Sequence, residues 1–548
     1  MIRHVAWLIC AVLLGGSVGL AQESDQRRED RMRWWREARF GLFIHWGPVS
    51  LKGTEIGWSR GGERRGRGGR GPIPADEYDN LYRQFDPTEF DAEEWVAIAK
   101  SAGMKYLVFT TKHHDGFSMF DSKLTDYKIT NSPFKRDVTA ELARACHEGG
   151  IGLGFYYSPP DWYHPDYRTE NHARYIEYLH GQLRELCTNY GKVDIIWFDG
   201  LGGKPEDWDS EKLIAMVRQL QPGVIINNRG GLPEDFDTPE QRIGRFQTHR
   251  AWETCMTIGR QWAWKPDDQI KSLQECIGVL VRCAGGDGNL LLNVGPMPTG
   301  EIEPRQVQRL KEIGEWLEQY GESIYATRGG PFRPGPWGAS THKGNTVYVH
   351  VLNWPEEGLT LPPLDKKVLA SSVLTGGTAA VEQSEDGISI AVPPADRQEN
   401  DTIVALQLDG PAAQASPAWK SLATGKQATA SNVYTNNPVH GPDKAFDGDY
   451  ATRWATDHGV SEAWLEVDLG EPTTFDRAVL SEEYDRVRQF ELQCRNEGEW
   501  RTFARGKRIG HDLMLKFEPV TARFVRLNIR KAVDGPTIWE FQLLAPRG

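Results

Sequence analysis

Cysteine is scarce in this sequence, and its spacing does not suit metal binding. The chain has 7 cysteines in 548 residues. Beyond Cys10 they are scattered, with no C-x-x-C pair, and no H-E-x-x-H segment occurs. These absences argue against a structural zinc site or a zinc protease. Most of the thiols are expected to be small core residues, and the spacing favours no particular disulfide.

Long hydrophobic runs are also lacking after the first 21 residues. At the N-terminus Arg3 and His4 precede the apolar run AWLICAVLLGGSVGLA, which ends in small residues at Ala21. This order predicts a secretory signal peptide over residues 1–21, and hence a secreted or periplasmic protein. A membrane anchor is the alternative, but the run is short for a span of ~20 residues, and Cys10 has no lipobox around it.

An excess of positive charge is a third feature that the chain lacks. Its formal net charge is −12, which argues against nucleic acid or an anionic membrane as a general partner. The content of 39% hydrophobic and 26% charged residues is that of a soluble globular protein. The length predicts two or three domains. Nothing in the sequence indicates an oligomeric state, and no long internal repeat is present.

Between about residues 35 and 325, apolar strands alternate with amphipathic helices. The candidate strands are nearly continuous apolar runs, which is typical of strands covered on both faces in parallel βα architecture. Asp91 and Asp137 stand where helix N-caps are expected, with Gly103 and Gly149 beyond the same two helices. The candidate strands are 41–46, 106–111, 152–158, 193–199, 223–228 and 289–295.

Polar side chains stand at or just past the ends of these candidate strands. Since such ends meet at one face of a βα barrel, where active sites lie, the set predicts a single site. The residues are His45, His113, His114, Tyr156, Asp199 and Arg229. Asp199 closes the run VDIIWFD and is the best nucleophile candidate, because an apolar setting makes a carboxylate costly unless function requires it.

After residue 325 the pattern changes to short alternating strands with glycine and proline between them. A small antiparallel β domain is expected over residues 326–410. The segment DGPAAQASPAW, residues 409–419, is typical of a linker. Short strands such as WLEVDLG and RFVRLNIR then predict a β-sandwich over residues 418–548.

Five segments in residues 30–330 resemble the α-L-fucosidases of glycoside hydrolase family 29. They are RFGLFIHWG, KHHDGF, FYYSPPDW, WFDG and GGDGNLLLNVGP, at residues 39–47, 112–117, 155–162, 197–200 and 285–296. The resemblance implies a (β/α)8 TIM-type barrel over residues 22–325. It also implies an exo-acting enzyme that removes terminal fucose with retention of configuration, with a fucosylated glycan as substrate and no catalytic cofactor.

The resemblance also implies roles for individual residues. Asp199 matches the nucleophile of the family. The histidines His45, His113 and His114 match positions that bind fucose hydroxyls, and Tyr156, Trp197 and Arg229 match further pocket positions. Read without the family, three histidines also suit a metal ion, so a metal site remains the rival interpretation.

The acid/base residue is marked less clearly. In such enzymes it lies in a variable loop ~40 residues after the nucleophile, and two glutamates qualify. Glu240 is preferred, because its segment DFDTPEQ is similar to family segments that carry the acid/base and its distance from Asp199 is suitable. Glu253, in HRAWETC, is the alternative; it would otherwise bind sugar or pair with a base such as Arg250.

The loop after the first strand departs from the family pattern. Many relatives have an acidic residue directly before a tryptophan here, whereas this chain has Gly57 before Trp58, with Glu55 further back. Trp58 is still expected to pack on substrate, and the role of Glu55 is open. The arginines that follow are Arg60, Arg64, Arg65, Arg67 and Arg70. They predict a solvated loop or, as the sharper hypothesis, a contact to an anionic glycan.

Residues 418–548 resemble discoidin-like (coagulation factor type C) domains and family 32 carbohydrate-binding modules. The similarity lies in ATASNVY, KAFDGDYATRWAT, WLEVDLGE and IWEFQLL. It implies a sugar-binding module with a structural Ca2+ held by Asp447, Asp449, Thr452 and Glu540, whose oxygens suit a hard cation. An ordinary Asp-Gly turn is the alternative.

Two other functions remain open at this level. One is a barrel glycosidase for another sugar, such as a galactoside; fucose is L-galactose without its 6-hydroxyl, so an apolar patch at C6 would separate the two. The other is a lectin-like protein whose barrel has lost activity.

Overall fold

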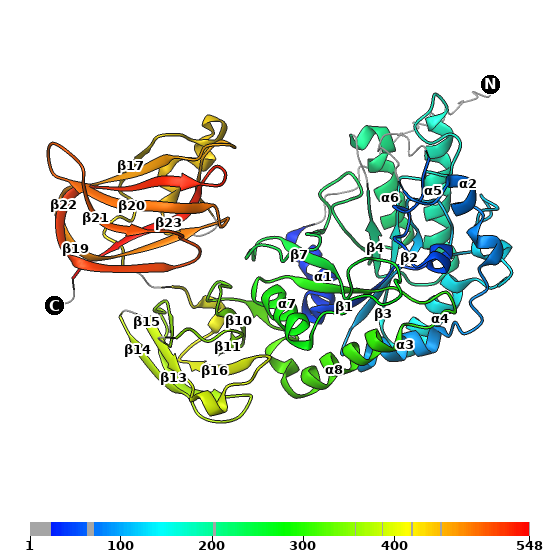
Figure 1. The fold of residues 1–548 in the computed structure, drawn as a ribbon, viewed down its shortest axis with the longest axis horizontal. Helices are drawn as coiled ribbons and strands as arrows, with labels where there is room; N and C mark the ends of the chain where they lie inside the picture. The colour runs from blue at the N-terminus through cyan, green and yellow to red at the C-terminus, as the bar shows by residue number, and fades with distance from the viewer. Residues whose placement is uncertain are drawn as a thin grey trace, which may run out of the picture.

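The protein folds into three parts, which Figure 1 shows side by side in a computed structural model. The structure describes residues 24–62, 71–200, 204–356, 358–385, 387–417, 420–449 and 452–546. The predicted signal peptide at residues 1–21 lies outside these ranges. Within them, no helix is long and apolar enough to cross a membrane.

The first part is a parallel eight-stranded barrel, as predicted. The strand order is β5-β4-β3-β2-β1-β8-β7-β6, and a parallel bridge from Asn227 to Phe236 joins the two ends. Its strands are buried along almost their whole length, which explains the uninterrupted apolar runs. The bounds are β1 Phe40–Ile44, β2 Tyr106–Lys112, β3 Gly152–Tyr157, β4 Ile195–Phe198, β5 Ile225–Ile226, β6 Phe236–Asp237, β7 Ala251–Thr257 and β8 Asn289–Val294.

Helices surround this barrel, and two of them begin at the predicted caps. Asp91 accepts hydrogen bonds from the backbone of Glu93 and Glu94, and Asp137 accepts one from Ala140. The second helix runs through Gly149, and the left-handed residue that ends it is Gly150. The bounds are α1 Asp25–Ala38, α2 Ala75–Tyr78, α3 Ala92–Ser101, α4 Val138–Gly149, α5 His172–Asn189, α6 Ser210–Leu220, α7 Leu273–Gly285 and α8 Pro304–Tyr320.

The second part is the small antiparallel β domain. It has a five-stranded sheet and a three-stranded sheet with an apolar core between them. The first sheet contains β9 Arg328–Gly329, β10 Gly338–Lys343, β11 Thr346–Val351, β13 Val368–Val373 and β16 Thr402–Leu408. The second contains β12 Leu359–Leu361, β14 Ala380–Ser384 and β15 Gly387–Ala391.

The third part, here the C-terminal module, is the predicted β-sandwich. Alternate residues of its strands enter one hydrophobic core around Leu465, Leu492 and Leu527. Its strands are β17 Gln427–Ala430, β18 Trp454–Ala455, β19 Ala463–Glu482, β20 Val487–Arg495, β21 Arg501–Gly506, β22 Leu513–Ala532 and β23 Thr537–Leu544. The six cysteines within the described residues are free and buried.

Candidate active site

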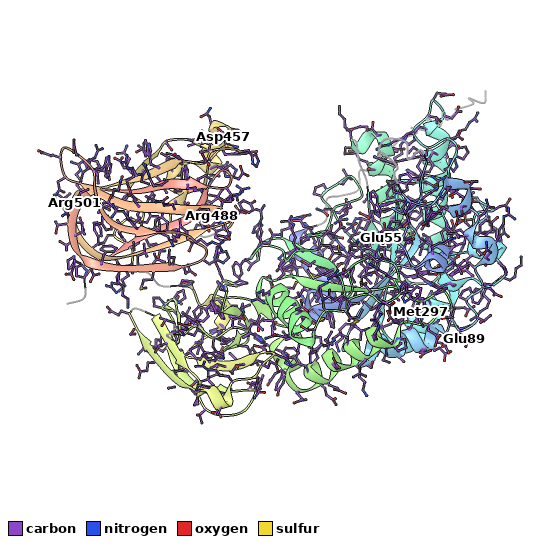
Figure 2. All side chains as sticks on the ribbon, in the orientation of Figure 1. Glu55, Glu89, Met297, Asp457, Arg488 and Arg501 are labelled. Carbon is purple, nitrogen blue, oxygen red and sulfur yellow. The ribbon has the colours of Figure 1, made fainter. Side chains whose placement is uncertain are left out.

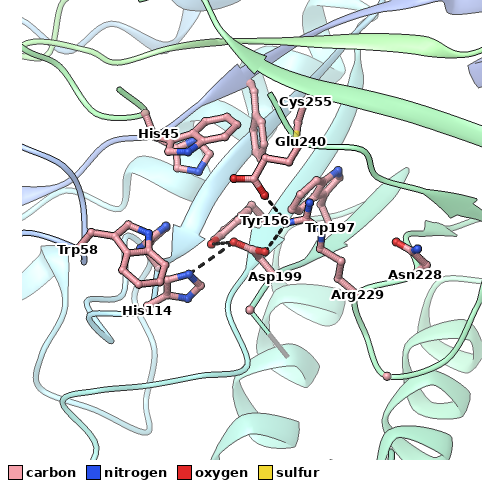
Figure 3. A pocket seen from close by; sticks show the side chains of 15 residues that line it. His45, Trp58, His114, Tyr156, Trp197, Asp199, Asn228, Arg229, Glu240 and Cys255 are labelled. Carbon is pink, nitrogen blue, oxygen red and sulfur yellow. Dashed lines mark hydrogen bonds and ion pairs between the residues drawn. The ribbon is translucent and has the colours of Figure 1, made fainter. Parts of the chain in front are cut away.

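A pocket of about 470 Å³ opens at the carboxyl ends of the barrel strands. The strand-end residues expected at one face all line it, because parallel strands bring their ends to the same rim. Figure 3 shows the side chains of His114, Tyr156 and Arg229 directed at Asp199. The lining residues are Phe43, His45, Trp58, His113, His114, Tyr156, Trp197, Asp199, Gly200, Asn228, Arg229, Gly231, Glu240, Cys255 and Trp262.

One guanidinium nitrogen joins the two carboxylates at the mouth of the pocket. Arg229 Nη1 lies 2.6 Å from Asp199 Oδ1 and 2.9 Å from Glu240 Oε2. Because both oxygens contact one atom, they lie within about 5.5 Å of each other, the carboxyl separation typical of retaining glycosidases. Arg229 is itself oriented by the side chain and carbonyl of Thr238, at 2.8 and 2.9 Å.

Asp199 is held in its ionised form. Burial alone would raise its pKa, but Arg229 and His114 lower it below the ordinary aspartate value, helped by hydrogen bonds from Arg229 and Tyr156. The Tyr156 hydroxyl donates to Asp199 Oδ2 at 2.9 Å, and His114 Nε2 is 3.6 Å from the same oxygen. A carboxylate that is ionised and partly buried suits a nucleophile.

Three buried histidines form one wall of the pocket. Burial lowers the pKa of His45 to about 3 and also lowers that of His113, so both rings are neutral near pH 7. His45 Nδ1 pairs with Asn293 Oδ1 at 2.6 Å. His113 Nδ1 has no hydrogen-bond partner among the described residues. Neutral imidazoles with an unused polar atom suit recognition of uncharged hydroxyl groups.

The pocket also contains a group of side chains that could hold a metal ion, as the rival interpretation expects. Among the described residues, His113, His114 and Asp199 form the one group of three that offers ligand atoms within 4.8 Å of one another. However, Arg229 already contacts Asp199 at 2.6 Å, and a metal cation there would lie beside a guanidinium. The arrangement therefore suits a sugar better than a divalent cation.

Aromatic rings form an apolar floor in the same pocket. The Tyr156 and Trp197 rings stack at 5.7 Å, and Phe43 lies 5.2 Å from Trp197. Trp262 covers His45 at 4.8 Å between ring centroids. Apolar faces beside polar donors suit a deoxy sugar, because its ring carries both hydroxyls and a methyl group.

Glu253, the alternative acid/base, does not line the pocket. Its carboxylate is fully buried beneath the aromatic floor and accepts hydrogen bonds from Trp35 at 3.3 Å, from Trp197 at 3.2 Å and from the Tyr106 hydroxyl. Burial raises its pKa to about 7. It also does not pair with Arg250, which contacts Asp237 instead.

The departure in the first loop has a steric reason. Gly57 has a φ of +65°, and a Cβ there would lie 2.7 Å from His113 Nδ1, so a larger residue before Trp58 would displace that imidazole. Glu55 is not among the residues that line the pocket. It accepts hydrogen bonds from the backbone of Trp262 and Ala263 at 2.9 and 3.2 Å, and so ties two pocket loops together.

The arginine-rich loop is described only at its start. Arg60 is buried and contacts Asp79 at 2.6 Å, so it is paired and is not part of a solvated loop. Arg64, Arg65, Arg67 and Arg70 lie outside the described residues. Trp58, just before, is 37% exposed and packs against His114 and Trp162 at the pocket edge.

Several lining residues were missed from the sequence. Trp262 follows β7 and Asn228 follows β5, so the strand-end rule could have found both. Phe43 and Cys255 lie inside strands, where an apolar residue has no signal that separates a pocket wall from a core.

The predicted calcium turn brings together part of its ligand set. Asp447 Oδ2 accepts from Thr452 at 2.8 Å, and Asp447 Oδ1 accepts from the backbone of Asp449 at 3.0 Å. Glu540 is 2% exposed, and its Oε1 has no hydrogen-bond partner among the described residues. Burial and Asp447 raise the Glu540 pKa to about 8. Lys444 lies 3.5 Å from Asp447 and would have to give way to a cation.

A βα barrel with two carboxylates across a sugar-sized pocket defines the class of glycoside hydrolases. The α-L-fucosidase family model matches residues 19–322, more than half of the chain, and the F5/8 type C domain model matches residues 427–541. The chain belongs to the α-L-fucosidase family and carries a discoidin-type C-terminal module.

Individual relatives agree with this assignment. Tissue α-L-fucosidase from Macaca fascicularis is 31% identical over 407 residues, covering 64% of this chain and 84% of its own. Among solved structures, α-L-fucosidase isoenzyme 1 from Paenibacillus thiaminolyticus is 35% identical with a TM-score of 0.64, covering 70% of this chain and 99% of its own. A Bacteroides thetaiotaomicron α-L-fucosidase, solved as a trapped covalent intermediate, is 31% identical with a TM-score of 0.62, covering 70% and 96%.

Proposed function

We propose that this protein is an exo-acting, retaining α-L-fucosidase that releases terminal fucose from glycans. The observation that carries the proposal is the bridged pair Asp199–Arg229–Glu240, whose oxygens lie within about 5.5 Å. A trapped covalent intermediate in the Bacteroides thetaiotaomicron relative supports the same two-step chemistry.

In the first step Asp199 attacks the anomeric carbon while Glu240 protonates the departing glycosidic oxygen. The bond to the aglycone breaks, and a fucosyl ester of Asp199 forms. Glu240, now ionised, then takes a proton from a water molecule, which attacks the same carbon and returns the carboxylate of Asp199. Arg229 contacts both carboxylates and offsets their mutual repulsion while Glu240 is ionised.

Specificity for fucose over galactose would come from the aromatic floor. Phe43, Trp197 and Trp262 offer apolar surface that suits a methyl group at C6, whereas a hydroxyl there would lose its hydrogen bonds to water. His45, His113 and His114 would bind the ring hydroxyls. Two carboxylates within about 5.5 Å of each other in one pocket also favour an enzyme over the lectin-like alternative.

The test compares aryl α-L-fucoside with aryl α-L-galactoside, which differs only by the 6-hydroxyl. We expect chromophore release from the fucoside and at least about tenfold slower release from the galactoside. Proton NMR should find the α-anomer of fucose first. Absence of fucose release, or the β-anomer appearing first, would overturn the proposal. A panel of fucosylated glycans of different linkage then identifies the natural aglycone.

We further propose that the C-terminal module binds glycan and a structural Ca2+. Asp447, Asp449, Thr452 and Glu540 would hold the ion through oxygen atoms. The buried Oε1 of Glu540, which has no hydrogen-bond partner in the described part of the chain, supports this. Adding Ca2+ after chelation should raise the unfolding temperature of the full chain but not that of an Asp447→Asn variant. Equal unfolding temperatures with and without Ca2+ would show that this segment is an ordinary Asp-Gly turn. Secretion or periplasmic export remains a proposal from the N-terminal sequence.

A further inference from the structure

The loop that carries Glu240 runs from β6 to β7, and its first half follows β7 closely. The Cys255 backbone donates to Pro239 at 3.1 Å, and Gln241 donates to Cys255 at 3.0 Å. Gly244 donates to the Thr254 hydroxyl at 3.2 Å. A Cβ on Gly244 would lie 2.4 Å from the Trp252 ring, so this part of the loop presses against the strand.

One residue further on, the loop reaches the C-terminal module. The guanidinium of Arg245 contacts the Glu483 carboxylate, and its Nη2 donates to the Tyr484 hydroxyl at 2.5 Å. The same guanidinium lies 5.2 Å from the Tyr484 ring centroid. The Glu483 side chain is only 1% exposed and also contacts Arg453 of the module. A carboxylate that is buried between two arginines resists displacement, because losing either partner leaves an under-compensated charge.

A second contact lies beside the first. Arg333, which is 8% exposed, stands between Phe246 of the loop, 5.3 Å away, and Trp539 of the module, 4.3 Å away. His511 of the module pairs with the carbonyl of Pro334 at 2.6 Å. Figure 1 shows β7 at the side of the barrel nearest the module. The module is therefore docked on the loop as well as tethered to the chain.

Resting on the proposed role of Glu240, we propose that the C-terminal module positions the acid/base. Glu483 and Tyr484 hold Arg245, and Arg245 fixes the loop segment whose other end places Glu240 on Arg229. Arg245 is thus a positioning residue, since it is not among the residues that line the pocket.

The test separates positioning from plain stabilisation by the leaving group. Arg245→Ala and Glu483→Gln are made in the full chain, with Tyr484→Phe as the milder change. A misplaced acid matters most for poor leaving groups, since a phenol with a low pKa departs without protonation. We expect kcat/KM to fall about tenfold on methyl α-L-fucoside and by less than about twofold on an activated aryl fucoside.

Arg505→Ala is the matched control. Arg505 of β21 contacts Glu491 of β20 at 3.1 Å, an arginine–glutamate pair that lies within the module, with side chains 70% and 19% exposed. Figure 2 shows Arg501 of the same strand at the edge of the module away from the barrel. This variant should keep the wild-type ratio between the two substrates.

A double-mutant cycle with Glu240→Gln completes the test. Once the acid is gone, Arg245→Ala should cause no further change in the substrate ratio, because the two residues act through one group. Equal losses on both substrates, an unchanged ratio in both Arg245→Ala and Glu483→Gln, or additive effects in the cycle would each overturn the inference. A wild-type protein that releases fucose from neither substrate would instead refute the proposed function itself.

Discussion

One glutamate lies at the mouth of the barrel pocket and another lies beneath its aromatic floor, and they differ in exposure and in hydrogen bonding. At the mouth Glu240 sits on a loop, its side chain 43% exposed and its carboxylate on Arg229. At the floor Glu253 sits on β7, fully buried under Trp197 and Tyr106. The first can reach a substrate oxygen and exchange protons with water, whereas the second has its lone pairs occupied by neighbouring donors.

The difference shows why a buried carboxyl with a raised pKa is not by itself a catalytic acid. Burial raises the pKa of Glu253 to about 7, which looks well tuned for proton transfer. Yet a general acid must reach the leaving group, and Glu253 does not line the pocket. Its hydrogen bond to Trp197 instead orients a ring of the sugar-facing floor.

Removing the nucleophile should have the largest effect at the mouth. Asp199→Asn is expected to lower kcat on an aryl fucoside by about four orders of magnitude, because covalent catalysis is lost. In Asp199→Ala, where the shortened side chain leaves room, azide should restore part of the rate by attacking the anomeric carbon and displacing the aryl group, which gives fucosyl azide. Unchanged thermal unfolding serves as the control, and retention of more than ~1% activity would show that Asp199 has another role.

Substitutions of Glu240 and Glu253 should differ in how strongly their effect on kcat/KM depends on the leaving group. Glu240→Ala is expected to lose about 100-fold more kcat/KM on a poor leaving group than on an activated aryl fucoside. Glu253→Gln should lower both values by one common factor, since Trp197 is its one hydrogen-bond partner that lines the pocket. If the leaving-group dependence follows Glu253 and not Glu240, the two assignments must be exchanged.

Glu253 should make the free energy of unfolding depend on pH. The folded pKa of Glu253, about 7, lies above the unfolded value of roughly 4.3, so protonated Glu253 favours the fold. Its contribution is full below about pH 4 and is lost as pH rises to about 7, by up to ~3 kcal/mol. Glu253→Gln should remove this slope from the barrel transition in urea. Parallel curves for the two proteins between about pH 4 and 8 would contradict it.

The smallest effect is expected for the arginine-rich segment, most of which lies outside the described residues. If the substrate is a sulfated or otherwise anionic glycan, neutralising Arg64, Arg65 and Arg67 should raise KM for it by about threefold at low salt. Added salt should shrink the difference, because it screens exposed charges. An uncharged aryl fucoside is the internal control and should be unaffected. If wild type and the triple variant have equal KM values for the charged glycan at low salt, the loop does not bind the anionic groups and the solvated-loop interpretation holds.

Local patterns in the chain were enough to predict the barrel, the β domains and the rim of the pocket. Uninterrupted apolar runs predict strands covered on both faces, and parallel strands carry their final residues to one edge. Asp199, His45 and Arg229 were therefore found without knowledge of any contact. The same reasoning preferred Glu240 but kept Glu253 as an alternative, since each lies in a plausible segment after Asp199.

Tertiary contacts decided the rest, because they join residues far apart in the chain. Glu253 accepts hydrogen bonds from Trp35 and Trp197 only because the fold brings α1 and β4 close to β7. That Gly57 must lack a side chain depends on His113 lying against it. The contact of Arg245 with Glu483 spans two domains, and neither residue carries any local sign of its partner. Periodicity reports which face of an element is buried, but the identity of the neighbour appears only once the elements are packed.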